Sequence, residues 1–356
     1  MTDLRESAQE GQPERSGIAA ESAGWAESTA VAGTLAPAVA VEAAASRWLL
    51  FVRWWTPGRT ALAVYLVVLA VYIRYEGVPM DRIGQTGWLL GGIVVHKIGQ
   101  PLRESTRAVF DWIPLLAALV IYDHTRGVAD TLGMPVHITD LVAAERALFA
   151  GHLPTVALQD SLYVVDTVHW WDVMASVVYF THFVVPWVLA AILYLVSRKL
   201  WVPYIRRVLL LTFAGLATYI LFPAAPPWYA AYGDYITDDV ARIATRGWEL
   251  LNLRSASAWL SSAQADANEI AAMPSLHSAF ALLVVVALWP HVRSAWGRTL
   301  LAAFPLAMAF TLIYGGEHYL IDVVVGWVYV ALVCLLAGAW ERWRATGSPS
   351  RHGIVA

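Results

Sequence analysis

The sequence predicts an all-α fold, a polytopic transmembrane helical bundle of about six to eight spans with a disordered N-terminal tail. Hydrophobic residues make up 58% of the 356 residues and charged residues only 14%, with a mean hydropathy of +0.55. Soluble domains contain about 45–50% apolar and about 25% charged residues. Several of the 18 tryptophans flank apolar runs, as in the aromatic belts of membrane proteins. These observations indicate an integral membrane protein.

The segment 1–46 has a different composition from the rest of the chain. It is rich in Ala, Glu, Ser and Gly and contains no periodic apolar pattern. Such a segment buries too little surface to offset its ordering entropy, so we expect a disordered tail that is not a signal peptide. The formal net charge of −3 indicates no nucleic acid partner. The single cysteine, Cys334, rules out a disulfide framework within the chain.

Seven apolar runs approach the length of about 20 residues that a bilayer core requires. The run 111–125 is short. The runs cover 60–76, 111–125, 170–197, 205–222, 275–292, 298–316 and 319–340. Residues 84–98 fit a short crossing, a re-entrant segment or an interfacial helix. Residues 223–273 form a long polar loop with a helix-like stretch near 238–262.

The basic residues in short loops predict the orientation of the bundle. Lys and Arg gather in 197–207, in 291–298 and after the last run, so these segments should be cytoplasmic. The opposite ends, around 223–274 and 314–318, are then extracytoplasmic. This arrangement requires 84–98 to cross the membrane.

Two histidines are expected to meet at the extracytoplasmic side. One helix starts at His277, the chain turns at 291–298, and a second helix returns to His318. Each leg has about 19 residues and spans about 28 Å, so both ends return to the same membrane face. Asp322 follows His318 by four residues and shares its helical face. A carboxylate there can fix the imidazole tautomer and leave the other nitrogen free as a nucleophile.

The residues around these histidines suit a bound phosphate. Pro274 precedes a helix start, which offers free backbone N–H groups together with the hydroxyls of Ser275 and Ser278. Gly316, beside Gly315, would let the backbone approach the anion closely. The pattern favours phosphoryl transfer through a phosphohistidine. His318 would attack phosphorus and His277 would protonate the departing oxygen.

The motifs "PSLH" at 274–277 and "HYLID" at 318–322 resemble those of the type 2 phosphatidic acid phosphatase superfamily. The stretches "FDWIPLLAALVIYDHTRG", "VYFTHFVVP" and "FPAAPPWY" are similar to its inositolphosphotransferase, or inositol phosphorylceramide synthase-like, branch. The resemblance covers roughly 105–340. It implies His318 as nucleophile, Asp322 as its orienting group, His277 as acid and Ser275 as a phosphate contact. With the composition and the apolar runs, we expect four segments: a disordered tail 1–46, a membrane helix and connecting segment 47–104, a transmembrane catalytic domain 105–341 and a cytoplasmic tail 342–356.

The chain lacks the basic residues that this superfamily uses for phosphate. Thr311 and Leu312 stand where the last motif usually opens with Ser-Arg, and the first motif of the superfamily is not present. We therefore expect Arg126 to meet the phosphate charge, with Arg246 as second candidate. Tyr122, four residues before Arg126, and His182, in the middle of a predicted span, are further candidates for the substrate pocket.

The predicted activity is that of a cell-membrane phosphotransferase with its site on the extracytoplasmic face. It would move a phosphoryl or phosphoinositol-type headgroup from a lipid phosphate or phospholipid to an alcohol or lipid acceptor. Covalent catalysis by histidine needs no cofactor, and the acidic residues and histidines show no local spacing typical of a metal site. Three alternatives stay open: a lipid phosphatase for phosphatidic acid or a polyprenyl phosphate, a transporter with a histidine proton relay, and a bis-histidine haem protein.

Overall fold

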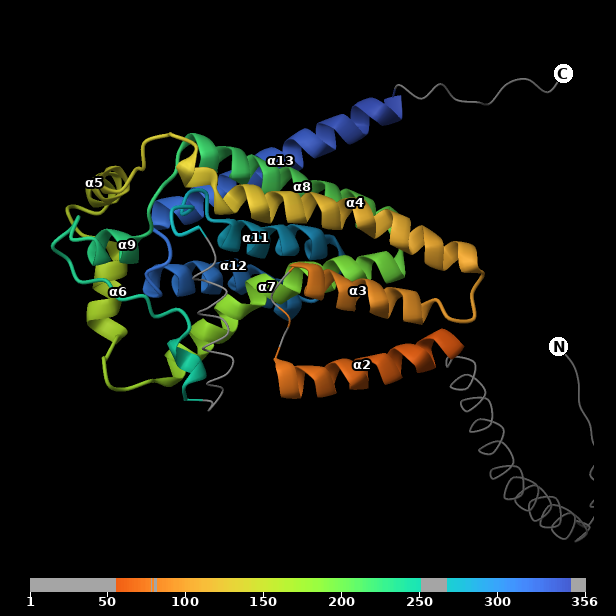
Figure 1. Ribbon diagram of the computed structural model, residues 1–356. Coiled ribbons are helices and arrows are strands. Elements are labelled where there is room, and N and C mark those ends of the chain that lie inside the picture. The colour runs from red at the N-terminus through yellow and green to blue at the C-terminus, as the bar shows by residue number, and fades with distance from the viewer. Residues whose placement is uncertain (1–55, 78, 80–81, 251–267, 347–356) are drawn as a thin grey trace, which may run out of the picture. The chain divides into compact units, whose positions relative to one another are not determined.

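The computed structural model describes residues 56–77, 79, 82–250 and 268–346, and these residues form helices and no β-strand (Figure 1). The chain separates into two compact units, Met1–Thr60 and Ala61–Ala356. The predicted tail 1–46 lies outside the described residues. Among the described residues, six helices are long and apolar enough to cross a membrane, which confirms the predicted helical bundle. They are α2 (Pro57–Glu76), α4 (Leu102–Gly127), α7 (Trp170–Val196), α8 (Arg198–Leu221), α12 (Ala295–Tyr314) and α13 (Leu320–Thr346).

Two shorter apolar helices complete the set of predicted runs. The helix α11 (Leu276–Leu288) has 13 residues and continues as the 3₁₀ turn η3 (Trp289–His291), where Pro290 ends the regular pattern. The segment 84–98 forms α3 (Arg82–His96), a helix of 15 residues that packs against α4 and α7. At about 1.5 Å per residue, both helices are shorter than the hydrocarbon core of a bilayer.

The helix α4 is longer than its apolar run predicted, and the carboxylate at the start of that run, Asp111, is paired. It begins at Leu102, whereas the run began at 111. Both guanidinium nitrogens Nε and Nη2 of Arg198 donate to the Asp111 carboxylate at 2.7 Å, and the Tyr194 hydroxyl donates to it at 3.1 Å. A carboxylate whose charge is paired in this way can lie inside an otherwise apolar helix.

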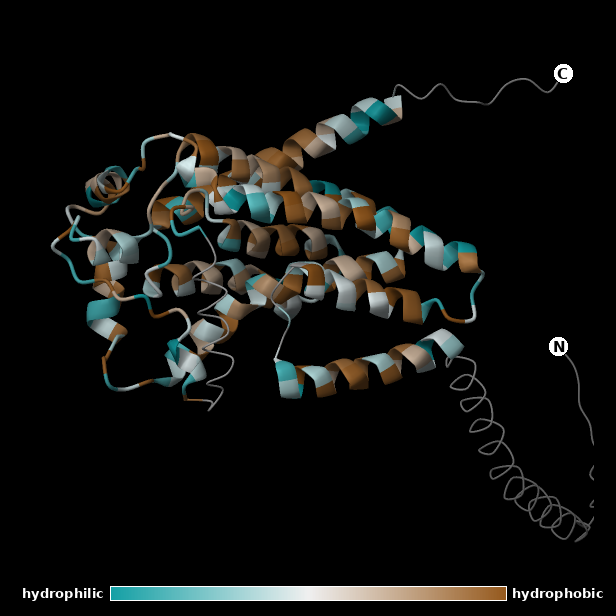
Figure 2. Cartoon of the chain, viewed as in Figure 1, coloured by the Kyte–Doolittle hydropathy of each residue, from teal (hydrophilic) through white to brown (hydrophobic). Residues whose placement is uncertain are grey.

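A group of short helices covers one end of the bundle, at the left of Figure 1. It consists of α5 (Thr139–Leu148), α6 (Pro154–Leu162), α9 (Pro227–Tyr232) and the 3₁₀ turns η1 (Ala129–Thr131) and η2 (Arg246–Trp248). Figure 2 shows hydrophilic and hydrophobic residues mixed along these short helices. The predicted helix-like stretch near 238–262 was wrong for 238–245, which run without helix before η2, while 251–267 lie outside the described residues.

The centre of the bundle is α11, which packs against α7, α8, α12 and α13. Its first turn approaches α13 so closely that a Cβ atom at Gly326 would lie 2.5 Å from the Ser275 carbonyl oxygen and 2.8 Å from Ser278 Oγ. A side chain there would force the two helices apart. The glycine therefore permits the contact that brings the starts of α11 and α13 together.

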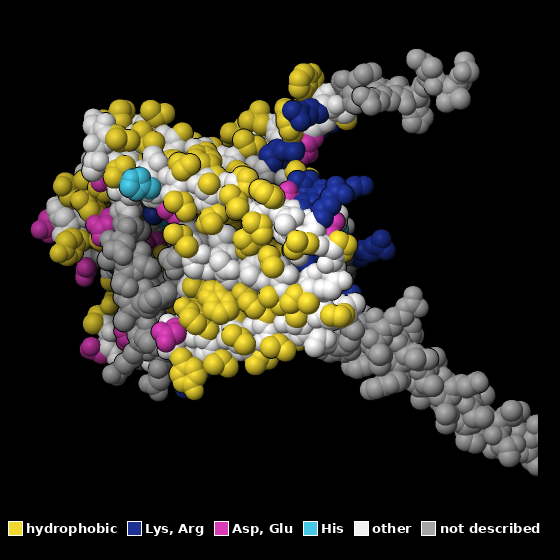
Figure 3. All heavy atoms as spheres, turned by 45° about the vertical axis from the view of Figure 1, so that its right-hand side comes forward, with side chains coloured by type: hydrophobic (Ala, Val, Ile, Leu, Met, Phe, Trp, Pro, Cys, Tyr) yellow, Lys and Arg dark blue, Asp and Glu magenta, His cyan; other side chains and the backbone are white. Residues whose placement is uncertain are grey.

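The charged residues are unevenly distributed along the bundle. In Figure 3, Lys and Arg side chains gather at one end of the visible face, Asp and Glu gather mainly at the other, and hydrophobic side chains lie between. Paired basic residues belong to the first of these ends: Arg206 and Arg207 both bind Glu341 near the end of α13. This pattern is typical of a membrane protein whose basic end faces the cytoplasm.

Candidate active site

The helical hairpin brings the two motif histidines into contact. His277 is the second residue of α11, and His318 lies two residues before the start of α13. Nε2 of His318 lies 3.4 Å from Nδ1 of His277, although the residues are 41 positions apart in the chain. His318 is 5% exposed, so the pair lies within the protein rather than at its surface.

Asp322 holds His318 and the start of α13 at the same time. Its Oδ2 atom lies 3.5 Å from His318 Nδ1 and accepts a hydrogen bond of 2.9 Å from the Tyr319 N–H. Its backbone carbonyl accepts from the Ser275 N–H at 3.0 Å, which joins it to the start of α11. One residue therefore connects the two helix starts and faces the ring nitrogen of His318 that points away from His277.

A second buried carboxyl group, which the sequence analysis did not identify, supports the same turn. Glu145 of α5 is fully buried, and its Oε1 accepts a hydrogen bond of 2.8 Å from the Leu320 N–H. The consecutive N–H groups of Tyr319 and Leu320 are thus each bound by a different carboxyl group. Burial, and to a smaller extent the nearby Asp322, raises the pKa of Glu145 to about 7.

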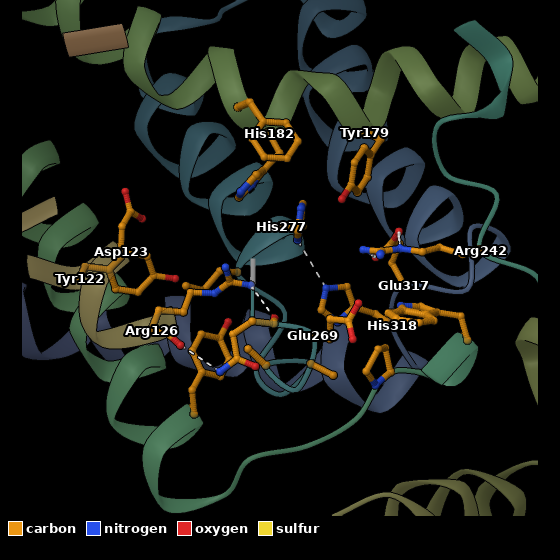
Figure 4. Close-up of a pocket in the computed structure, with 18 residues that line it drawn as sticks. Tyr122, Asp123, Arg126, Tyr179, His182, Arg242, Glu269, His277, Glu317 and His318 are labelled. Carbon is orange, nitrogen blue, oxygen red and sulfur yellow. Dashed lines mark hydrogen bonds and ion pairs between the residues drawn. The ribbon is translucent and has the colours of Figure 1, made fainter. Parts of the chain in front are cut away.

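Aromatic rings from α7 form a wall against His277. The ring of His182 has its centroid 3.9 Å from that of His277, and Tyr179 stacks on His277 at 5.1 Å with an angle of 18°. Both residues lie one helical turn apart on α7 and point into the same space (Figure 4). The predicted pocket residue His182 therefore contacts the histidine that we expect to move protons.

Two arginines reach toward the histidines from opposite sides (Figure 4). Arg126, at the end of α4, donates from Nη2 to the Asn268 carbonyl at 3.3 Å. Arg242, in the long loop, donates from Nε to Glu317 at 2.9 Å and lies 4.4 Å above the Trp228 ring. Their guanidinium groups give the site two positive charges that do not come from the usual motifs.

These side chains line one pocket of about 140 Å³. Its walls come from α4, α7, α8, α9, the loop before α11 and the turn before α13. Basic, acidic, aromatic and aliphatic groups all contribute; the lining residues are Tyr122, Asp123, Arg126, Tyr179, His182, Phe183, Tyr219, Pro226, Trp228, Arg242, Asn268, Glu269, Ala271, Ala272, Leu276, His277, Glu317 and His318. The pocket combines nucleophilic, cationic and hydrogen-bonding groups, as a phosphate-ester site requires.

Four predicted phosphate contacts do not line this pocket: Ser275, Ser278, Gly316 and Arg246. Ser275 and Ser278 are fully buried: Ser275 Oγ caps α11 by accepting from the Ser278 N–H at 3.4 Å, and Ser278 Oγ donates to the Ser275 carbonyl at 3.0 Å. Gly316 has φ +75°, and a Cβ there would lie 2.8 Å from the Ala241 carbonyl oxygen. Its close approach is therefore to the long loop, and not to an anion.

Arg246 is placed away from the pocket, which corrects the expectation that it could meet the phosphate. Its Nη2 donates to the carbonyls of Val164, Val165 and Thr167 at 2.9–3.2 Å. The guanidinium also lies 4.5 Å from the centroid of the Tyr163 ring. Carbonyl oxygens from the segment between α6 and α7 thus bind this guanidinium through Nη2.

The predicted residues Tyr122 and Arg126 do lie in the pocket, whereas Arg242, Glu317 and Glu145 were missed. The position of Glu317 directly before His318 was a signal that could have identified it. Arg242 and Arg246 lie in the same loop with no difference in local pattern. Only the fold distinguishes them, because Ile243 N–H binds the Gly315 carbonyl at 3.1 Å and so places Arg242 beside Glu317.

Comparisons with known proteins agree with this site. A sequence model of the PAP2 superfamily matches residues 139–336, which include both histidines and Asp322. The chain is also 30% identical over 287 residues to a protein of Bacteroides thetaiotaomicron named phosphoinositol dihydroceramide synthase, covering 78% of this chain and 87% of that protein. No solved structure matches the chain.

Proposed function

Because the chain belongs to the PAP2 superfamily and is a membrane lipid phosphotransferase, we propose that it transfers a phosphoinositol-type headgroup through a phosphohistidine on His318. The observation that carries this proposal is the convergence of His318, His277 and Asp322 in one pocket. The name of the relative supports a phosphoinositol headgroup and a ceramide-type acceptor. Two arginines and three carboxylates in the pocket supply the groups that such a headgroup needs.

In the first step, the lone pair of His318 Nε2 forms a bond to phosphorus. Asp322, whose Oδ2 lies 3.5 Å from His318 Nδ1, would accept the Nδ1–H as the ring moves into position and so keep Nε2 unprotonated. The bond between phosphorus and the lipid oxygen of the donor breaks, and protonated His277 gives its proton to that oxygen. Since Nε2 of His318 and Nδ1 of His277 are 3.4 Å apart, the His277 ring must turn aside to admit phosphorus.

In the second step, the hydroxyl oxygen of the acceptor lipid attacks phosphorus. Neutral His277 takes the hydroxyl proton, and the bond between phosphorus and His318 breaks. Both histidines return to their first protonation states. When water replaces the acceptor, the same step becomes hydrolysis, which is the phosphatase alternative.

The guanidinium groups of Arg126 and Arg242 would meet the charge on the non-bridging oxygens. They replace the basic residues that the superfamily motifs usually provide and that this chain lacks. Charged donors fixed before reaction lower the barrier because no solvent must reorganise around the transition state. The pair Arg242 and Glu317 keeps one of these cations in place before substrate arrives.

The carboxylates in the pocket support a polyol headgroup. Asp123, Glu269 and Glu317 line the same space as the two arginines. Ionised carboxylates only accept hydrogen bonds, and the hydroxyls of a cyclitol or sugar donate them. A bare phosphate monoester would instead be repelled by these groups.

We place the reaction at the extracytoplasmic face of the cell membrane. The basic residues near the start of α8 and the end of α13 support a cytoplasmic position for that end of the bundle. The site lies at the opposite end. A cysteine introduced at Tyr232, which is 85% exposed at the end of α9, tests this orientation. An impermeant thiol reagent should label it from outside intact cells, and labelling only after lysis would reverse the orientation.

The activity itself is tested with the purified protein in vesicles. A phosphoinositol glycerophospholipid labelled in the headgroup serves as donor, and a ceramide serves as acceptor. The proposal expects label to move to the ceramide with release of diacylglycerol. Release of inorganic phosphate from phosphatidic acid, with no transfer to the ceramide, would support the phosphatase instead.

A further inference from the structure

A second cavity lies beside the catalytic pocket and shares one wall residue with it. The cavity measures about 120 Å³ and is bounded by α2, the segment after it, α3 and α7. Phe183 lines both spaces. Apart from Gln85, the described side chains around the cavity are apolar or aromatic; they are Leu69, Ile73, Pro79, Trp88, Leu89, Phe183, Val184, Trp187 and Val188.

The α7 residues that line the cavity follow directly after those that line the catalytic pocket. His182 and Phe183 line the catalytic pocket, and Val184, Trp187 and Val188 follow them on the next turns. At 1.5 Å per residue, His182 and Val188 are about 9 Å apart along the helix axis. The direction is away from the short helices that cover the site and toward the other end of the bundle. A chain attached to a phosphate at the histidines would enter this cavity.

One polar atom in the cavity has no partner. Gln85 is 9% exposed, and its buried Oε1 atom makes no hydrogen bond to any described residue. Burying an amide oxygen without a donor is unfavourable, so such an atom points to a ligand that supplies one. Gln85 is the fourth residue of α3, at the end of this helix that lies nearest α2 in the chain.

We propose that this cavity holds an aliphatic chain of the lipid acceptor and that Gln85 Oε1 accepts a hydrogen bond from an amide N–H or hydroxyl near the start of that chain. The inference rests on the proposed function, since it places the acceptor oxygen at His277. It deepens that function by assigning the acceptor to lipids with a donor group at the base of the chain. The helix α2, whose Leu69 and Ile73 line the cavity, exposes Val64, Val67 and Val71, as expected for a helix surrounded by lipid.

The first test fills the cavity. Val184→Trp should raise KM for a long-chain ceramide about tenfold, because several buried methylenes lose their place. Ile192→Trp is the matched control, since Ile192 is 50% exposed on the same helix and does not line the cavity. A short-chain, water-soluble ceramide analogue should react equally with both variants, which shows that Val184→Trp folds. Equal KM values for the long-chain ceramide in the two variants would overturn the proposal.

The second test removes the amide oxygen. Gln85→Leu should lower kcat/KM about fivefold for a ceramide but leave it unchanged for an analogue without amide N–H and hydroxyl donors at the base of its chain. An equal loss for both acceptors would contradict the hydrogen bond.

A ceramide carrying a diazirine in its acyl chain separates this inference from the proposed function. Irradiation should attach it to peptides of α3 and α7 that contain Trp88 or Trp187, and Val184→Trp should reduce this labelling. Labelling of the cavity without headgroup transfer would contradict the proposed function but not the cavity assignment. Headgroup transfer with labelling of other peptides would contradict the cavity assignment but not the proposed function.

Discussion

Nε of Arg242 donates a hydrogen bond of 2.9 Å to Glu317, a residue 75 positions away and directly before His318. This contact ties the long loop after α9 to the turn that carries the proposed nucleophile. Glu317 is 8% exposed, so the carboxylate of the pair is largely shielded from water, whereas Arg242 stays accessible. The guanidinium keeps its charge at the pocket wall, where a phosphate oxygen would meet it.

Arg242 and Arg246 provide a matched pair of substitutions in one loop. Arg242→Gln should lower kcat/KM for headgroup transfer by about 10²–10³, as loss of a fixed charged donor does in other sites. Arg246→Gln should leave kcat/KM near the wild-type value, because its guanidinium binds carbonyls outside the pocket. Steady-state transfer assays on equal amounts of folded enzyme measure the difference. Equal losses in both variants would show that Arg242 has no special role.

Gly326 and Gly338 test the contact between α11 and α13. Gly326→Ala should destabilise the protein by about 1–3 kcal/mol and lower activity, because the new methyl group meets Ser275 and Ser278. Gly338→Ala is the control on the same helix, since its Cβ would meet only the flexible Arg342 side chain at 3.4 Å. Thermal unfolding in detergent and transfer activity report the two effects. A stable, fully active Gly326→Ala variant would contradict the described packing.

Glu145 should position the turn after His318 through the Leu320 N–H. Glu145→Gln keeps an acceptor for this N–H and should retain most of the activity, whereas Glu145→Ala leaves it unpaired and should lower kcat more than it raises KM. Headgroup-transfer kinetics for both variants provide the comparison. Similar kinetics for the two would mean that the acceptor atom does not matter.

The raised pKa of Glu145 also predicts a pH dependence of stability. Its pKa of about 7 in the folded protein lies above the ordinary value of 4.5 for a glutamate, so the folded state favours the protonated carboxyl. This contribution is complete below pH 4.5 and is lost as pH rises through about 7. The stability of Glu145→Gln relative to wild type should therefore increase from about pH 5 to about pH 8. A constant difference in unfolding temperature over this range would count against the buried acid.

His277 should act on both halves of the reaction, as acid and then as base. His277→Ala should lower transfer from a lipid donor by about 10²–10⁴. A donor with a nitrophenol leaving group needs no protonation, so the first step should recover while the second stays slow. Rapid mixing should then show a burst of nitrophenolate followed by slow turnover. Full recovery of turnover would show that His277 is not the base of the second step.

The sequence predicted the parts of the site that depend on regular geometry. Two helical legs of similar length return His277 and His318 to the same membrane face, and an i,i+4 relation places Asp322 beside His318. These arguments need only the helix rise and period. The bundle and its spans followed from apolar runs in the same way.

The residues that sequence reasoning missed depend on contacts between distant segments. Arg242 reaches the pocket because Ile243 binds the Gly315 carbonyl, and no local pattern encodes this pairing. The hydroxyls of Ser275 and Ser278 were expected at the phosphate, but the close packing of α11 on α13 directs them to backbone groups instead. Glu145 sits on a short amphipathic helix whose partner could not be read from its own sequence.

The proposed mechanism depends on the covalent intermediate on His318. The direct measurement is rapid quenching of the enzyme with a donor labelled at phosphorus, followed by mapping of the labelled residue. The account predicts acid-labile, base-stable label on His318 in the wild type, more of it in His277→Ala with the nitrophenyl donor, and none in His318→Ala. Transfer by the wild type without label on His318, or near-normal turnover by His318→Ala, would contradict it.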